Sequence, residues 1–275
     1  MSLKVWLDGV LMEEAEARVS VFDHGLTVGD GVFETLKTYG GKPFAVRRHL
    51  ERLAASAAGM GLLAPAPAVL RAALEEVAAA NDLVDDALRI TLTGGPGPLG
   101  SARGEAGPTV VVAPGRLGPW PETTGIAVVP WPRNERGALS GLKTTSYGEN
   151  VVALAWARER GAGEAVFANL AGNVCEGTGT NVVVALGGRL VTPPLSAGCL
   201  AGVTRALVVD ACGIAEEDIP LEALPLVEEA FLTSTTREVQ AIGAIGGRPL
   251  PAAPGPLTQA AAKALADLVA TDLDP

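Results

Sequence analysis

The sequence predicts an α/β protein of two domains, in which hairpins and helices follow one another irregularly. The length of 275 residues suits one large or two modest domains. Hydrophobic residues make up 48% of the chain and charged residues 19%, a balance typical of a protein that buries a full core. Short strand patterns occur beside helical patterns, without the regular strand–helix repeat of a parallel α/β sheet.

The first half is predicted to begin with two hairpins and to continue with helices. Asp8-Gly9 between two apolar triplets is a strong two-residue hairpin signal, and Gly40-Gly41-Lys42 marks a second turn. Leu50, Leu53 and Ala57 share one stripe at helical spacing, which predicts a helix. The predicted elements are strands over 5–7, 10–12, 32–39 and 43–46, helices over 47–58 and 68–80, and strands over 89–93 and 110–113.

Proline and glycine interrupt the apolar pattern over residues 114–119, which are the best linker candidate. We therefore predict an N-terminal α/β domain over residues 1–115, a linker over 116–121 and a C-terminal domain over 122–275. The elements predicted after the linker are strands over 126–129, 165–167, 181–185, 190–192, 229–233 and 239–242, and helices over 149–160, 203–211 and 257–269.

Composition also limits the partners and the compartment. The formal net charge of −10 argues against binding to nucleic acid or to anionic membranes. No uncharged apolar stretch is long enough to span a bilayer, and no signal-like apolar run occurs near the start. The three cysteines (Cys175, Cys199 and Cys212) lack CxxC spacing, and only two histidines occur, so we expect neither disulfides nor a metal site. We expect a cytoplasmic protein with reduced thiols.

Lys143 is the most informative of the five lysines in the chain. It lies in Gly141-Leu142-Lys143-Thr144-Thr145-Ser146-Tyr147, a run of small hydroxyl residues that ends in a phenol. A lysine that forms a Schiff base must lose its proton, and burial can lower the pKa of its amine. Small neighbours leave room for a bulky cofactor. On its own the motif also fits a lysine in a surface loop, and the downstream motifs favour the functional interpretation.

Three downstream motifs supply groups that Lys143 would need. Glu176, followed by Gly-Thr-Gly-Thr, can keep a pyridine nitrogen protonated, although an exposed turn glutamate would look the same. Val203 and Thr204 open a predicted helix whose N-terminus can bind phosphate, although ordinary helix capping is the alternative. Ser234 and Thr235, in a Thr-rich turn, could add hydroxyl donors. An amine, a carboxylate and hydroxyl-rich turns together suit pyridoxal 5'-phosphate.

Two other patterns do not support phosphate-loop or hydrolase chemistry. The Gly94–Pro98 stretch lacks a following Gly-Lys-Ser/Thr, and its prolines remove N–H donors, so it is not a phosphate loop. We interpret it as a mobile loop. His24 and His49 have no serine or cysteine in a nucleophile-elbow context, so hydrolase chemistry is unsupported.

Read together, these segments resemble the class IV, or fold-type IV, family of pyridoxal-phosphate enzymes. Its members include branched-chain aminotransferases, D-amino-acid aminotransferases and aminodeoxychorismate lyases. The most specific part is the ordered series of Glu176, Asn181, residues 190–193 and residues 202–205. The resemblance implies a D-amino-acid aminotransferase-like fold, with an α+β N-terminal domain, a β-rich pseudo-barrel C-terminal domain with helices, and the cofactor between them. It also implies a homodimer whose active site borrows loops from the partner subunit.

The resemblance implies a role for each matching residue. Lys143 would form the Schiff base, Glu176 would pair with the pyridine nitrogen, and Arg52, in His49-Leu50-Glu51-Arg52-Leu53, would grip the phosphate. The other implied cofactor-binding residues are Tyr147 near the ring oxygen, Val203 and Thr204 at the helix start, and Thr235 in the later turn.

Thr35 decides which reaction the sequence favours. It stands where the lyases carry a threonine near the substrate side of the ring, so we expect Thr35 to be catalytic together with Lys143. We therefore expect a 4-amino-4-deoxychorismate lyase of the folate pathway, which releases pyruvate to give p-aminobenzoate. The alternative is a transaminase of the branched-chain or D-amino-acid type acting on a small amino substrate. A more distant alternative is a non-catalytic cofactor-binding protein.

Overall fold

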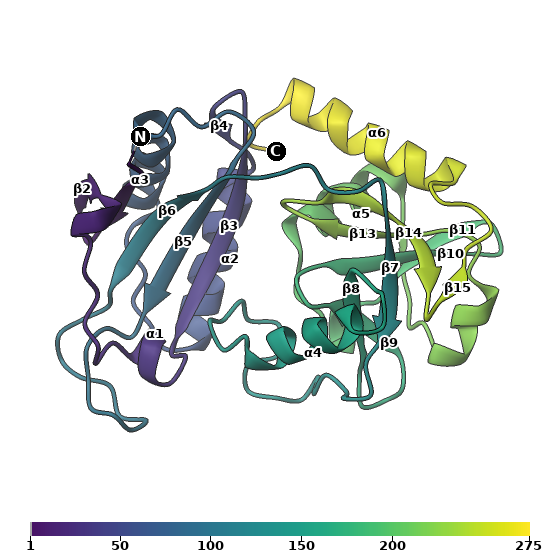
Figure 1. The fold of residues 1–275 in the computed structure, drawn as a ribbon, viewed down its shortest axis with the longest axis horizontal. Helices are drawn as coiled ribbons and strands as arrows, with labels where there is room; N and C mark the ends of the chain where they lie inside the picture. Colours follow the sequence, from purple (N-terminus) through teal and green to yellow (C-terminus); the bar gives the residue numbers. More distant parts are fainter. Residues whose placement is uncertain (1) are drawn as a thin grey trace. The chain divides into compact units, whose positions relative to one another are not determined.

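The computed structural model describes residues 2–275, which form two compact units (Figure 1). Unit 1 comprises the residues up to Gly118, together with Leu142–Tyr147 and Thr271–Pro275. Unit 2 comprises Pro119–Gly141 and Gly148–Ala270. The chain therefore enters unit 2, returns once to unit 1 for the Lys143 segment, and returns again at its C-terminal end.

Unit 1 is built on a six-stranded sheet in which every pair of neighbours is antiparallel. Its strands, in the spatial order β2-β1-β6-β5-β3-β4, are β1 (Lys4–Leu7), β2 (Val10–Glu13), β3 (Gly31–Tyr39), β4 (Lys42–Pro43), β5 (Ala87–Thr93) and β6 (Val110–Gly115). Its helices are α1 (His24–Thr27), α2 (Val46–Gly59) and α3 (Pro67–Ala80), with a short 3-10 turn at Glu14–Glu16.

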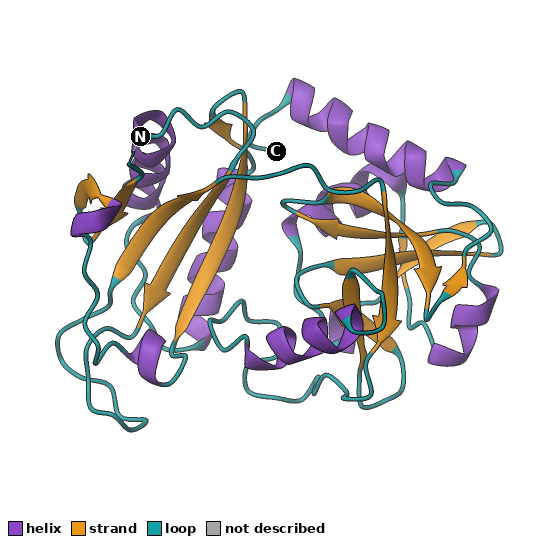
Figure 2. Cartoon of the chain, viewed as in Figure 1, coloured by secondary structure: helices purple, strands orange, loops and turns teal. Residues whose placement is uncertain are grey.

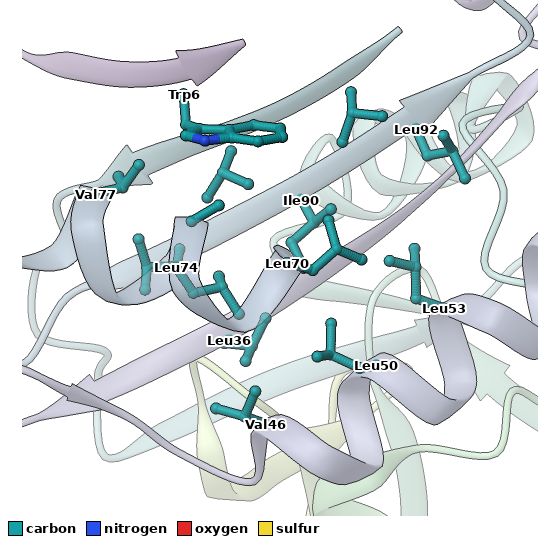
Figure 3. Close-up of a cluster of buried hydrophobic side chains, with 14 of the residues drawn as sticks. Trp6, Leu36, Val46, Leu50, Leu53, Leu70, Leu74, Val77, Ile90 and Leu92 are labelled. Carbon is teal, nitrogen blue, oxygen red and sulfur yellow. The ribbon is translucent and has the colours of Figure 1, made fainter. Parts of the chain in front are cut away.

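Helices α2 and α3 bury one face of this sheet. The apolar stripe predicted for residues 47–58 faces the strands, where Leu50 and Leu53 pack with Leu36 of β3 and with Leu70 and Leu74 of α3 (Figure 3). Burying each such leucine contributes about 1.5–3 kcal/mol relative to an exposed position. This core fixes which face of β3 points inward.

One predicted boundary in unit 1 is wrong. The sequence predicts a strand over residues 43–46, but Val46 is the first residue of α2. Ala45 adopts a left-handed backbone with φ of 52°, which ends β4 and turns the chain into the helix. A left-handed conformation at a residue other than glycine is uncommon, so the apolar pattern around it gave no sign of the turn.

The segment 142–147 pairs with β3, although the sequence assigned it to the second domain. The backbone N–H of Phe33 donates to the carbonyl of Lys143 at 3.0 Å, and that of Thr145 donates to the carbonyl of Gly31 at 2.8 Å. These two bonds extend the sheet edge by one short piece of chain. The pairing is between residues far apart in sequence, so no local pattern predicts it.

Unit 2 is strand-rich, as its orange arrows in Figure 2 show, and its sheet is mixed. The pairs β14/β7, β7/β8 and β11/β12 are parallel, and the other pairs are antiparallel. The strands run in the spatial order β12-β11-β10-β13-β14-β7-β8-β9, with β15 beside β14. They are β7 (Thr123–Val128), β8 (Glu164–Ala168), β9 (Val174–Gly177), β10 (Asn181–Leu186), β11 (Arg189–Thr192), β12 (Ala215–Glu216), β13 (Ala230–Ser234), β14 (Glu238–Ile245) and β15 (Arg248–Pro249).

Three helices accompany this sheet: α4 (Gly148–Arg158), α5 (Val203–Cys212) and α6 (Pro256–Thr271). Two 3-10 turns lie at Leu195–Ala197 and Leu221–Leu226. The core of the unit is aliphatic, with buried Val166, Val182, Leu232 and Ile242 among its members. Within residues 2–275, no helix combines the length and the apolar character needed to cross a membrane.

The sequence correctly predicted helices at α4, α5 and α6, but it predicted no strand at Glu176. Glu176 lies on β9, paired with Phe167 across an antiparallel ladder with β8. The strand continues through Gly177, and the turn begins at Thr178. A strand position gives Glu176 a defined direction that a loop position would not.

Candidate functional site

Three side chains of unit 1 gather around one aromatic ring, that of Phe33. The Nζ atom of Lys143 lies 4.3 Å from the centroid of the Phe33 ring, and Cζ of Arg89 lies 3.7 Å from the same centroid. Tyr147 packs edge-on against Phe33, with 5.2 Å between the ring centroids. The backbone N–H of Lys143 donates to the hydroxyl of Ser56 at 3.1 Å. Phe33 thus acts as a platform that holds an amine, a guanidinium and a phenol together.

The pleat of β3 places Thr35 on the same face as this platform. Side chains alternate along a strand, and Val32 points into the helix-covered core, so Phe33 and Thr35 point to the other face. Thr35 pairs directly with Arg89 across the β3–β5 ladder. The two residues predicted to be catalytic, Thr35 and Lys143, therefore share the face of the sheet that α2 and α3 leave uncovered.

Arg89 adds a cation to this face of the sheet. The sequence did not predict Arg89 as a site residue. Its Nε donates to the hydroxyl of Thr91 at 3.2 Å, and it takes part in none of the ion pairs found within residues 2–275. Burial lowers the pKa of the Arg89 guanidinium, and the nearby phenol of Tyr147 acts in the opposite direction. A guanidinium with no carboxylate partner is suited to bind one from a ligand.

Arg52 is held by a carboxylate on the core face of β3. Glu34 is fully buried and accepts from Nε of Arg52 at 2.7 Å, from Nη2 of Arg52 at 2.8 Å and from Nδ1 of His49 at 2.7 Å. Burial alone would raise the pKa of Glu34, but Arg52 and then His49 outweigh it and lower that pKa to about 2. Burial lowers the pKa of His49, against the opposing effect of Glu34. Glu34 is thus an anion that fixes the guanidinium by a two-point contact.

Glu176 and Asn181 of unit 2 hold the segment that leads into α5. Oε2 of Glu176 accepts from the backbone N–H of Leu200 at 2.9 Å, and Nδ2 of Asn181 donates to the Leu200 carbonyl at 2.9 Å. Nε of Arg133 lies 3.5 Å from Oε1 of Glu176, and the Arg133 guanidinium stacks on Phe167 with 4.0 Å to the ring centroid. Glu176 is therefore an oriented carboxylate with a cationic neighbour.

Helix α5 presents its N-terminus without a side-chain cap. Its N-cap residue is Gly202, so no side chain there competes for the first-turn N–H groups, which include those of Val203 and Thr204. A Cβ atom at position 202 would collide with Oδ1 of Asn181, so the close approach of the two segments requires glycine. The uncapped N–H groups and the positive end of the helix dipole suit a phosphate.

The predicted hydroxyl turn connects β13 to β14. Ser234 pairs with Glu238 across the hairpin, which leaves Thr235 to Arg237 in the loop. Glu238 is left-handed with φ of 57°, and the backbone N–H of Arg237 donates to the Ser234 hydroxyl at 3.2 Å. Oγ1 of Thr233 is buried and has no hydrogen-bond partner within residues 2–275. The turn offers hydroxyls on a tightly bent backbone.

The predicted site residues fall into two groups. Those in unit 1 are Thr35, Arg52, Lys143 and Tyr147, and those in unit 2 are Glu176, Val203, Thr204, Ser234 and Thr235. Each group contains chemistry that suits pyridoxal phosphate. Unit 1 offers an amine for its aldehyde and a guanidinium for its phosphate, and unit 2 offers a carboxylate for its ring nitrogen and helix N–H groups and hydroxyls for its phosphate.

Sequence reasoning missed Glu34 and Arg133 as supporting residues. A signal existed for Glu34, because it occupies a core-facing position of an alternating strand, where a carboxylate requires a buried partner. Arg133 lies in a loop before α4. No sequence pattern indicated its role, because its contact with Glu176 depends on tertiary structure. Asn181 belongs to the sequence motif that begins at Glu176, and its hydrogen bond to the Leu200 carbonyl explains its place in that motif.

Comparison with known proteins gives a consistent result over most of the chain. The family described as amino-transferase class IV matches residues 31–245. A Methanocaldococcus jannaschii protein, provisionally named a branched-chain-amino-acid aminotransferase, is 33% identical over 257 residues, covering 90% of this chain and 89% of that protein. The D-alanine aminotransferase of Bacillus licheniformis is 31% identical over 280 residues and covers 98% of each chain.

A solved structure agrees with these relatives. The branched-chain aminotransferase of the thermophilic archaeon Thermoproteus uzoniensis, with norvaline, has a TM-score of 0.90 and 34% identity, and the match covers 98% of this chain and 95% of that one. The similarity confirms the predicted fold class and the predicted family resemblance.

Proposed function

Because the chain belongs to the class IV aminotransferase family, we propose that it transfers an amino group between an α-amino acid and a keto acid. Enzymes of this family depend on pyridoxal phosphate. The observation that carries the proposal is the cluster of Lys143, Arg89 and Tyr147 around Phe33, because it sets an amine beside a cation that can bind a carboxylate.

Lys143 has two tasks in this proposal. When bound, pyridoxal phosphate supplies an aldehyde that reacts with amines and a ring that withdraws electrons. Lys143 holds the cofactor through its amine, and then moves a proton at the substrate carbon that bears nitrogen. The Phe33 ring beneath Nζ limits the positions of the amine, and Arg89 binds the substrate carboxylate on the same face.

The remaining residues bind and tune the cofactor. Glu176 would hold the ring nitrogen and keep it protonated, and Tyr147 would hold the ring oxygen. Arg52, positioned by Glu34, binds the phosphate. The further phosphate contacts proposed are the α5 N–H groups at Val203 and Thr204 and the hydroxyl turn at Ser234 and Thr235.

We further propose that the enzyme is a cytoplasmic homodimer acting on a small amino substrate. Support for the homodimer comes from a run of exposed apolar side chains between β2 and β3, because such patches commonly mark subunit interfaces. These side chains are Val19, Val21, Phe22, Leu26 and Val28. The free thiols suit a reducing compartment. Light scattering coupled to gel filtration tests the dimer, and a monomer at micromolar concentration would contradict it.

The sequence favoured 4-amino-4-deoxychorismate lyase, and one observation keeps that reaction as a second candidate. The Thr35 hydroxyl lies on the same face as the Lys143 platform, where it could protonate the leaving group that becomes pyruvate. The relatives similar along the whole chain are named aminotransferases, which is why amino transfer comes first.

Cofactor binding is tested by absorbance and trapping. Purified protein incubated with pyridoxal phosphate should show a visible band, and borohydride followed by peptide mapping should find the reduced adduct on Lys143. Lys143→Ala should abolish the band, whereas Lys263→Ala, an exposed lysine on α6, should leave it unchanged. A wild-type protein that shows no visible band with pyridoxal phosphate would contradict the proposed function.

The two reactions are separated by their need for an acceptor. Amino transfer should change the band on addition of a D- or L-amino acid alone, and should turn over only when a keto acid is present. The lyase reaction should release pyruvate from 4-amino-4-deoxychorismate without any keto acid. Thr35→Val should then abolish pyruvate release while Thr35→Ser retains it, and acceptor-free pyruvate release would displace amino transfer as the proposed function.

A further inference from the structure

A buried carboxylate in unit 2 holds the turn that follows Glu176. Glu164, the first residue of β8, is 1% exposed. Its Oε1 accepts from the backbone N–H of Thr178 at 3.1 Å, from the Thr178 hydroxyl, and from the backbone N–H of Ala165 at 3.0 Å. The Thr180 hydroxyl lies 3.5 Å from Oε2. This one side chain therefore sets the conformation of the turn between β9 and β10.

Arg237 connects the same carboxylate to the hydroxyl turn. Its Nη2 lies 3.2 Å from Oε2 of Glu164, and only 9% of the Arg237 side chain is exposed. Nη1 donates to Oε1 of Gln240 at 2.8 Å, and the guanidinium stacks on Trp120 with 4.2 Å to the ring centroid. The Arg237 backbone N–H bonds the Ser234 hydroxyl. Contacts with Glu164, Gln240 and Trp120 thus fix the Arg237 guanidinium, and the turn itself fixes the Arg237 backbone.

The electrostatics explain why this pair matters to both turns. Burial lowers the pKa of Arg237, and Glu164 opposes that effect. A buried ion pair often adds little stability compared with apolar side chains of similar size, but removing one partner leaves an uncompensated charge. The pair therefore resists any displacement of one turn relative to the other.

We propose that the Arg237–Glu164 pair is a positioning pair that holds the Ser234–Thr235 turn in the conformation that binds the cofactor phosphate. The inference rests on the proposed role of this turn. Neither Arg237 nor Glu164 touches the cofactor in this proposal; they act through the turn. The consequence is that the pair determines how strongly the protein prefers pyridoxal phosphate over unphosphorylated pyridoxal.

The test compares the affinity of the protein for these two aldehydes, measured by titration of the visible band. Arg237→Met should weaken pyridoxal phosphate binding about tenfold or more, the effect expected when a charge-assisted phosphate contact is lost. Pyridoxal binding should change by less than about threefold, because pyridoxal has no phosphate to lose. Arg237→Lys, which keeps the charge, should recover part of the preference.

Two further variants separate positioning from folding. The double variant Arg237→Met with Glu164→Gln removes the stranded buried charge, so it should fold even where the single variant does not, and should still lack the preference. Arg189→Met, which breaks the exposed Arg189–Glu217 ion pair in the same unit, should bind both aldehydes like the wild type.

The outcomes are distinct. A double variant that keeps the wild-type preference, or that loses affinity for both aldehydes equally, overturns the positioning role while leaving the proposed function intact. A wild-type protein that binds neither aldehyde overturns the proposed function, and this inference fails with it.

Discussion

Replacing Glu34 with glutamine tests the physical basis of the unit 1 site. The change keeps the size of the side chain and removes its charge. It leaves the Arg52 guanidinium and the His49 imidazole without the anion that now accepts from both. Removing one partner of a buried ion pair typically destabilises a protein by about 3–5 kcal/mol.

The pKa of Glu34 gives an independent magnitude. That pKa is about 2 in the folded protein, against an ordinary value of 4.5. One pKa unit corresponds to about 1.4 kcal/mol, so the ionised carboxylate contributes about 3 kcal/mol to the free energy of unfolding. Because the folded pKa is depressed, this contribution is complete above pH 4.5 and is lost as the pH falls to about 2. His49, whose folded pKa is also lowered, adds a loss in the same direction below its ordinary pKa of 6.5.

Urea unfolding between pH 2 and pH 7 measures both quantities. We expect Glu34→Gln to lower the free energy of unfolding by about 3 kcal/mol at pH 7 and to flatten its dependence on pH between 4.5 and 2. Glu51→Gln, on an exposed position of α2, should change the free energy by less than about 1 kcal/mol. A Glu34→Gln protein as stable as the Glu51→Gln control, with the pH dependence of the wild type, would refute the reasoning.

Three further predictions concern the cofactor, the substrate and the core. Gly202→Ala should push Asn181 away from the start of α5 and weaken pyridoxal phosphate binding about tenfold or more, measured by titration of the visible band. Arg89→Met should raise KM for the amino substrate at least about tenfold with the cofactor band unchanged, and an unaltered KM would exclude Arg89 as the carboxylate partner. Leu74→Ala, fully buried on α3, should cost about 2–5 kcal/mol in urea unfolding, and a smaller loss would mean that the core collapses around the cavity.

Local chemistry explains the elements that were predicted well. The Asp8-Gly9 turn and the Leu50–Leu53–Ala57 stripe each depend on residues within a few positions of one another, and both predictions are confirmed. The prediction for residues 43–46 was wrong because a single left-handed residue, Ala45, decided the backbone there. The sequence motifs also predicted which residue types could form a pyridoxal phosphate site.

Only the tertiary structure decided which partners each site residue has. The Lys143 segment pairs with β3, Glu34 holds Arg52 from a neighbouring element, and Arg237 reaches Glu164 across unit 2. These contacts join residues from 18 to 114 positions apart, and their energies depend on burial that exists only after folding. Sequence alone therefore determined the family, most of the longer helices and strands, and the candidate chemical groups. The folded chain decided which charges are paired, because pairing depends on distance in space.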